Sequence, residues 1–234
     1  MLRAHYRNRI MKKLSIVCLA SLLSSPALAD VTVSIEKDFL EIGLYAPLFD
    51  NTYLFVGADT DDWLGVGLGF RHDLNQQWRL NAHYEYGLYD DWLMHEIGVD
   101  GVKTSSHQLD LSLTRYFKHA SLKIGATGEH IRNGFTWLTV DDVNKYSVYL
   151  GAAYYFEHVY LSSKYEHYLA VDKSHMEDFN QGHANVWEFS LGSMHSLFNF
   201  YPYVKVSVFD PNGVYYGQSN SDVTFSINGT FSFR

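Results

Sequence analysis

The closing stretch of the chain, residues 221–234, reads Ser-Asp-Val-Thr-Phe-Ser-Ile-Asn-Gly-Thr-Phe-Ser-Phe-Arg. Apolar side chains occupy every second position from Val223 to Phe233, apart from Gly229, and polar side chains fill the positions between them. This period of two predicts a β-strand with one apolar and one polar face. A soluble sandwich would turn the apolar face inward, whereas a membrane barrel turns it outward to lipid and keeps the polar face for its lumen.

The rest of the chain favours the barrel. The alternation returns in segments such as Trp78–Tyr89 and Tyr146–Phe156, with charged residues in mid-strand on one consistent face and aromatic residues at the strand ends. Short polar connections (72–77) alternate with long ones (90–104), as periplasmic turns and outer loops do. We predict an all-β fold, a single antiparallel transmembrane β-barrel of 12 strands in the bacterial outer membrane, or 10 strands if residues 31–47 form something else.

Residues 1–29 combine a basic start, an apolar run over 14–23 and an Ala-Leu-Ala exit before Asp30. This order is typical of a secretory signal peptide, and the run is shorter than the roughly 20 residues of a membrane-spanning helix. We therefore expect residues 1–29 to be an N-terminal extension with a cleaved signal, and residues 30–234 to be one barrel domain. The only cysteine, Cys18, lies in the first segment, so we expect no disulfide.

Charge excludes one class of partner. Five of the 18 Lys and Arg residues and none of the 26 Asp and Glu residues lie in residues 1–29, which leaves residues 30–234 with a formal charge of −13. Nucleic acid is therefore not an expected partner, because phosphate binding needs a basic surface. The expected partners are outer-membrane lipid, lipopolysaccharide and the barrel assembly machinery, which would read the C-terminal strand. We expect a monomer.

The polar faces of the predicted strands carry five cationic side chains, five anionic side chains and one histidine. These lumen-lining candidates are Arg71, Arg79, His83, Glu85, Asp110, Lys123, Glu129, Lys164, Glu166, Glu188 and Lys205. A pore for anionic sugars would be mainly basic, so this balance fits either a weakly selective water-filled pore or an ion-pair network that plugs the lumen. About 12 strands lie between barrels filled by side chains and open porins, which leaves both possibilities open. Gly65, Gly67 and Gly69 on the same faces are expected to make room for large neighbours.

A second class of function is an outer-membrane enzyme, either a lipid A or phospholipid hydrolase or a protease. Histidines gather towards the outer ends and loops: His95, His107, His130, His167, His175 and His183. However, His95-Glu96 lacks the second histidine of a zinc protease motif, and the His119-x-Ser121 spacing falls on a predicted periplasmic turn. No Ser–His or Asp–His pair stands out on neighbouring strands. We therefore predict no catalytic residue, no metal site, no cofactor and no enzymatic activity.

Four motifs near the start of the predicted barrel carry a family resemblance. They are Phe39-Leu-Glu-Ile-Gly-Leu-Tyr-Ala-Pro-Leu-Phe-Asp-Asn51, Tyr53-Leu-Phe-Val56, Gly65-Val-Gly-Leu-Gly-Phe-Arg-His72 and Tyr84-Glu-Tyr86. Together they resemble the opening of the intimin/invasin translocator barrel of the inverse autotransporters. That resemblance implies a 12-stranded barrel. Family members continue into an exported passenger, whereas this sequence stops at Arg234, so we expect a solitary barrel. It would act as a passive small pore or as a surface-exposed structural or interaction barrel.

Overall fold

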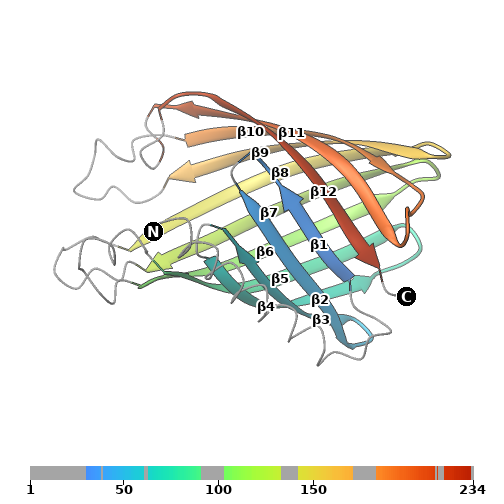
Figure 1. Ribbon diagram of the computed structural model, residues 1–234, viewed down its shortest axis with the longest axis horizontal. Coiled ribbons are helices and arrows are strands. Elements are labelled where there is room, and N and C mark those ends of the chain that lie inside the picture. Colours follow the sequence, from blue (N-terminus) through green and yellow to red (C-terminus); the bar gives the residue numbers. More distant parts are fainter. Residues whose placement is uncertain are drawn as a thin grey trace, which may run out of the picture.

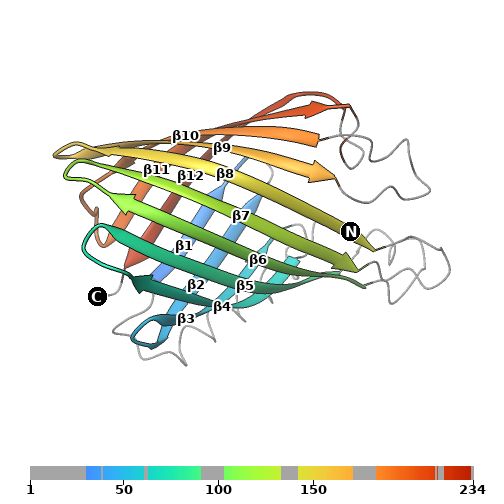
Figure 2. The same cartoon turned by 180° about the vertical axis from the view of Figure 1, so that it is seen from behind.

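The computed structural model describes residues 30–37, 39–60, 63–90, 103–132, 142–170, 183–213, 215 and 219–232. The expected signal peptide and the last two residues lie outside the described residues. The strands are β1 (Asp30–Ile35), β2 (Leu40–Phe49), β3 (Thr52–Asp59), β4 (Trp63–Asp73), β5 (Trp78–Asp90), β6 (Lys103–Tyr116), β7 (Ala120–Arg132), β8 (Val143–Tyr155), β9 (Val159–Ala170), β10 (His183–Ser193), β11 (Phe200–Asn212) and β12 (Asp222–Ser232). Each strand pairs antiparallel with the next along the chain (Figures 1 and 2).

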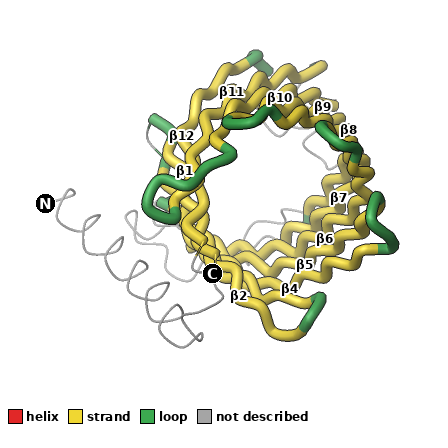
Figure 3. Tube along the Cα trace, turned by 90° about the vertical axis from the view of Figure 1, so that its right-hand side faces the viewer, coloured by secondary structure: helices red, strands yellow, loops and turns green. Residues whose placement is uncertain are grey.

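The first and last strands close the sheet into a barrel. Residues of β1 pair with residues of β12 from Asp30 opposite Ser232 to Ile35 opposite Ile227. Viewed along the barrel, β1 lies between β12 and β2, and the ring has no free edge (Figure 3). A membrane strand needs this closure because lipid cannot satisfy unpaired backbone groups. The prediction of a 12-stranded antiparallel barrel is confirmed.

The barrel is apolar outside and polar inside. Leu111 in β6 and Phe225 in β12 point outward and are 47% and 56% exposed, whereas the intervening Ser226 and Asn228 of β12 are 1% and 3% exposed. The closing strand thus has the phase that a membrane barrel requires, with its apolar side against lipid. The chain is an integral outer-membrane β-barrel. Among the described residues, no helix is long and apolar enough to cross a membrane.

The short connections place the two ends of the barrel relative to the membrane. The turns at 74–77, 117–119, 156–158 and 194–199 lie at the end where the described chain finishes, on the right in Figure 1. The opposite end has two short connections, after β1 and β3, and all four long ones, 91–102, 133–142, 171–182 and 213–221. Long loops mark the extracellular end of such barrels and short turns the periplasmic end, so these strand ends are extracellular.

Several strands extend further towards the extracellular end than the sequence pattern predicted. The structure starts β6 at Lys103, inside the connection predicted for 90–104, starts β8 at Val143 and β10 at His183, and continues β11 to Asn212. In these stretches the outward-facing positions change from apolar residues to His, Asn and Ser. The apolar alternation therefore stops before the hydrogen-bonded strand does.

Candidate functional site: the barrel lumen

The lumen holds a cavity of about 930 Å³ whose wall contains most of the candidate residues. Ten of the eleven line it directly: Arg71, Arg79, His83, Glu85, Asp110, Lys123, Glu129, Lys164, Glu166 and Glu188. The eleventh, Lys205, reaches this set through Glu188, because its Nζ lies 3.2 Å from Glu188 Oε1. The period-two alternation thus brings side chains from β4 to β11 to one surface.

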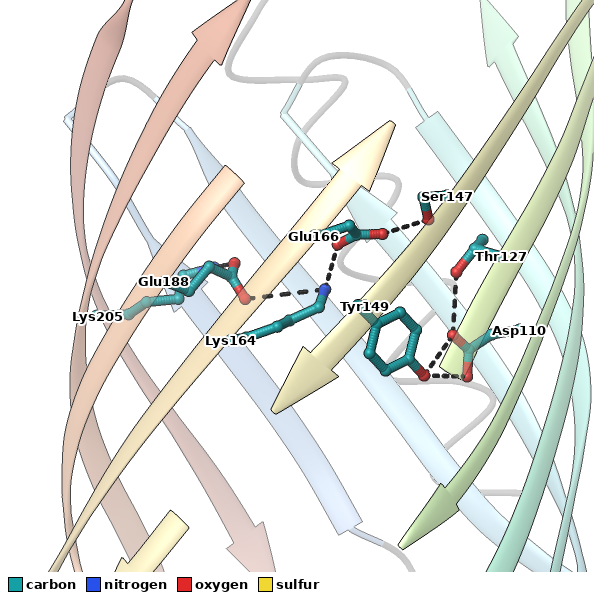
Figure 4. Close-up of polar contacts among 8 residues, drawn as sticks. All are labelled: Asp110, Thr127, Ser147, Tyr149, Lys164, Glu166, Glu188 and Lys205. Carbon is teal, nitrogen blue, oxygen red and sulfur yellow. Dashed lines mark hydrogen bonds and ion pairs between the residues drawn. The ribbon is translucent and has the colours of Figure 1, made fainter. Parts of the chain in front are cut away.

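One side of the lumen carries a chain of alternating charges (Figure 4). Lys205 Nζ contacts Glu188 Oε1, and Lys164 Nζ lies 3.9 Å from Glu188 Oε2. Lys164 also donates to Glu166, whose other oxygen accepts a 2.5 Å hydrogen bond from Ser147. The chain runs across β8 to β11, and each charge has a partner of opposite sign. Pairing of this kind offsets the free-energy cost of placing charged side chains at a half-buried surface.

A second cluster continues this wall towards β6. Asp110 accepts hydrogen bonds from the Tyr149 hydroxyl at 2.8 Å and from Thr127 Oγ1 at 3.1 Å. The Tyr149 ring, 5% exposed, has Lys123 Nζ and Lys164 Nζ at 5.1 and 4.9 Å from its centroid. The ring therefore links the Asp110 cluster to the charge chain through cation–π contacts. We call the residues of Figure 4 together with Lys123 the charged wall.

The other side of the lumen is built from rings. Tyr45, Tyr53, Phe55 and Trp63, which we call the aromatic wall, lie on β2 to β4. The Tyr45 centroid is 5.0 Å from Phe55 and 5.7 Å from Tyr53, and Phe55 is 6.2 Å from Trp63. His83 of β5 stacks on Tyr53 at 5.8 Å. Pairs at these separations attract one another beyond their buried area.

Glycines of β4 leave the space that these rings occupy. A Cβ built on Gly69 would fall inside the Tyr53 ring, and one built on Gly65 would fall inside the Trp63 indole. A Cβ on Gly67 would come within 2.5 Å of the Tyr84 carbonyl oxygen. The sequence predicted that these glycines make room for large neighbours but did not identify the rings.

Two further charged residues of the cavity lining were not among the sequence candidates. Glu41 of β2 lines the cavity near the aromatic wall. Lys145 of β8 also lines it, and its Nζ lies 3.8 Å from Glu129 Oε2. Lys145 shares the phase of Ser147 and Tyr149, but it lies just before the alternating segment Tyr146–Phe156. A longer predicted strand would have included it.

The histidines and acids of the enzyme hypothesis include one close pair. Asp142, which directly precedes β8, has its Oδ2 3.7 Å from His130 Nε2 of β7. The sequence pattern did not single out this pair, because Asp142 does not lie on a strand. Ser121 bonds the Tyr155 hydroxyl at 2.9 Å. His95 and His175 lie outside the described residues. Within the described ranges, no group of three or more His, Cys, Asp or Glu residues could hold a metal ion.

Comparison with known proteins relates the chain to outer-membrane barrels through its fold. No protein-family model and no curated protein sequence matches it. A solved structure described as a KdgM porin matches with a TM-score of 0.54 at 11% identity, covering 88% of this chain and 99% of that one. At this identity the likeness shows the fold alone.

Larger porins match less well. An anion-selective porin from Comamonas acidovorans and OpdO of Pseudomonas aeruginosa both have TM-scores of 0.46, at 14% and 12% identity. They cover 82% and 86% of this chain, which spans 59% and 60% of their length. The resemblance to the intimin/invasin barrel is not shown by these structures and stays a hypothesis.

Proposed function

We propose that this protein is a narrow, passive and weakly selective pore for ions and small hydrophilic solutes. The observation that carries the proposal is the length of the cavity. On β7 its lining runs from Ser121, near the periplasmic turn, to Glu129, near the extracellular end. These residues are eight apart, which corresponds to about 26 Å along a strand and to about 20 Å of membrane depth at the usual strand tilt.

The dimensions and charges of the cavity support a pore of low selectivity. A volume of about 930 Å³ over that depth gives a mean cross-section of roughly 45 Å², enough for hydrated ions and small solutes. The charged wall contributes both signs in pairs, so neither cations nor anions gain a large advantage. The rings of the aromatic wall occupy part of the cross-section of the lumen and limit the width of the pore.

Several finer expectations enter this proposal as hypotheses. The KdgM porin has a similar size, since the match covers 99% of its chain, which is consistent with a small pore. We propose that the barrel works as a monomer, assembled through its closing strand. A relationship to the inverse autotransporters, with a solitary barrel and no passenger, agrees with the strand number but is not required by the pore.

The alternative of an enzyme at the extracellular rim now rests on the His130–Asp142 pair. His130 accompanies Ile124 on the outward-facing side of β7, and its Nδ1 lies 2.9 Å from Asn144 Oδ1. A general base needs a nucleophile or water within about 3 Å, and the two ring nitrogens of His130 instead face Asn144 and Asp142. We therefore propose a non-enzymatic barrel. Hydrolysis of lipid A or phospholipid that disappears in His130→Ala would overturn this.

Electrical recording tests the pore directly. Residues 30–234 would be refolded in detergent, checked for heat-modifiable gel mobility and inserted into a planar bilayer. We expect stable conductance steps of one size and flux of monosaccharides into liposomes. A folded barrel that gives neither conductance nor solute flux would contradict the proposal and would indicate a plugged lumen.

A further inference from the structure

Four histidines lie outside the lumen, on the outward-facing side of the barrel near its extracellular end. His107 shares a face with Leu109 and Leu111, both exposed to lipid, because residues two and four apart in a strand point the same way. The same phase places His130 of β7, His167 of β9 and His183 of β10 on this side. We call these four residues and their hydrogen-bond partners the outer belt.

The belt residues contact one another across strands β5 to β8. Tyr84 Oη lies 2.7 Å from His107 Nδ1, and the rings of His107 and His130 are 6.4 Å apart. His130 Nδ1 lies 2.9 Å from Asn144 Oδ1, and His130 Nε2 is the atom that faces Asp142. These polar side chains therefore form a continuous patch and do not extend separately into solvent.

A second patch repeats the arrangement on β9 to β11. His167 Nδ1 lies 2.9 Å from Asn185 Oδ1, which also accepts a 2.7 Å hydrogen bond from the Tyr165 hydroxyl. The His167 and His183 rings are 5.0 Å apart, and His183 Nε2 lies 3.0 Å from Asn212 Nδ2. The repetition on separate strands points to a common environment along this side of the barrel.

Register fixes the depth of the belt in the membrane. His107 pairs with His130, and one step deeper Leu109 pairs with Gly128, so the belt directly borders the apolar band. Side chains at this level of a membrane barrel lie among lipid headgroups. Arg132 follows His130 on the same face and is exposed, which adds a cation beside the belt.

The periplasmic end of the same surface is different. Its outward-facing residues include Phe117, Phe156, Leu197 and Phe198, the last fully exposed. Arg115 lies over the Phe117 ring at 4.9 Å. Apolar rings with a few cations suit a phospholipid interface. The periplasmic turns also carry imidazole groups, because His158 Nδ1 lies 2.9 Å from His195 Nε2. The belt differs in that hydrogen bonds join its imidazole groups to phenol and carboxamide groups. The two ends therefore present different sets of polar groups to the membrane.

We propose that the outer belt binds the phosphorylated disaccharide headgroup of lipid A in the outer leaflet. Imidazole and phenol groups can donate to phosphate oxygens, and the carboxamides can bond sugar hydroxyls. Arg132 supplies positive charge, and Asp142 is the acid that faces His130. The inference rests on the outward face and the orientation of the barrel. It does not depend on whether the lumen conducts.

Binding to defined lipids tests the proposal. Wild-type residues 30–234 in detergent would be titrated with purified bisphosphorylated lipid A and separately with phosphatidylglycerol, and bound lipid counted by native mass spectrometry. We expect lipid A to bind at least ten-fold more tightly than phosphatidylglycerol. Equal affinity for both lipids would overturn the proposal, because any anionic headgroup would then suffice.

Matched histidine variants locate the site. The double variant His107→Ala/His130→Ala is expected to lose most of the preference for lipid A. The control variant His158→Ala/His195→Ala removes a histidine pair with rings 5.1 Å apart on the periplasmic turns and should keep it. If the belt variant fails to fold, His167→Gln/His183→Gln tests the second patch. Equal loss in belt and control variants, or no loss in either, would contradict the assignment.

Two further experiments test whether the belt binds the phosphates of lipid A directly or through a bridging cation. Dephosphorylated lipid A should bind more weakly than the bisphosphorylated form if the phosphates are recognised, and equal binding would refute a phosphate site. Lipid A binding should survive EDTA. Loss of binding in EDTA would show that a bridging cation, not direct contact with the belt, holds the lipid, and would overturn the proposal.

Discussion

The two walls of the lumen consist of different kinds of side chain on the same closed sheet. The charged wall consists of long side chains that reach across strands and pair, as Lys164 does with Glu166 and Glu188. The aromatic wall consists of rings that lie flat on glycines, as Tyr53 does on Gly69. The first wall carries paired charges of the lumen, and the second places aromatic rings along it.

Both walls depend on the alternation that turns polar side chains to the lumen and apolar side chains to lipid. A charge placed on the lipid-facing side should therefore cause the largest loss of stability. Leu111→Arg places a cation on the outward face near the middle of β6 and should lower the free energy of unfolding by about 2–4 kcal/mol. Gln108→Arg, which lines the cavity between Glu85 and Glu129, is the control and should cost much less. Urea unfolding in lipid vesicles would measure both. Equal losses would show that the assigned phase is wrong.

A methyl group added to a glycine should destabilise the barrel at the aromatic wall but not at the charged wall. Gly69→Ala places a Cβ in the Tyr53 ring and should destabilise the barrel by about 1–3 kcal/mol through overpacking. Gly151→Ala meets its nearest atoms, Lys123 Cβ and a backbone oxygen, at 3.6 Å, and should be nearly neutral. The same unfolding assay applies. A neutral Gly69→Ala would mean that the ring does not need the glycine.

Removing one hydroxyl from the charged wall should have a smaller effect. Tyr149→Phe keeps the ring but removes the hydrogen bond to Asp110, which should cost about 1 kcal/mol. Tyr160→Phe removes a hydroxyl from a ring that packs over Gly192 and serves as the comparison. A Tyr160→Phe loss as large as that of Tyr149→Phe would remove the special role given to the Asp110 cluster.

The alternation in the sequence was sufficient to predict which side chains face lipid and which face the lumen, because lipid favours apolar residues and the lumen favours polar ones. It predicted that Phe225 faces lipid, and it selected residues such as Lys164 and Glu188 that line the cavity. It could not identify which ring lies over Gly69, because that contact depends on the register between β3 and β4. It also missed the strand character of residues near His183, where the outward face becomes polar although the backbone pairing continues.

The most direct test of the pore is the reversal potential across a salt gradient for Lys123→Glu, compared with Lys118→Glu on an exposed periplasmic turn. A change of two charges about 8 Å from an ion in water corresponds to roughly 1 kcal/mol, favourable for a cation and unfavourable for an anion. Ionic screening over a similar distance reduces the combined effect to about a four-fold change in the permeability ratio of cations to anions. We predict that Lys123→Glu shifts the permeability towards cations by about this factor and that Lys118→Glu has little effect. Ion preference that is unchanged in Lys123→Glu, or shifted equally by both variants, would contradict conduction through the lumen.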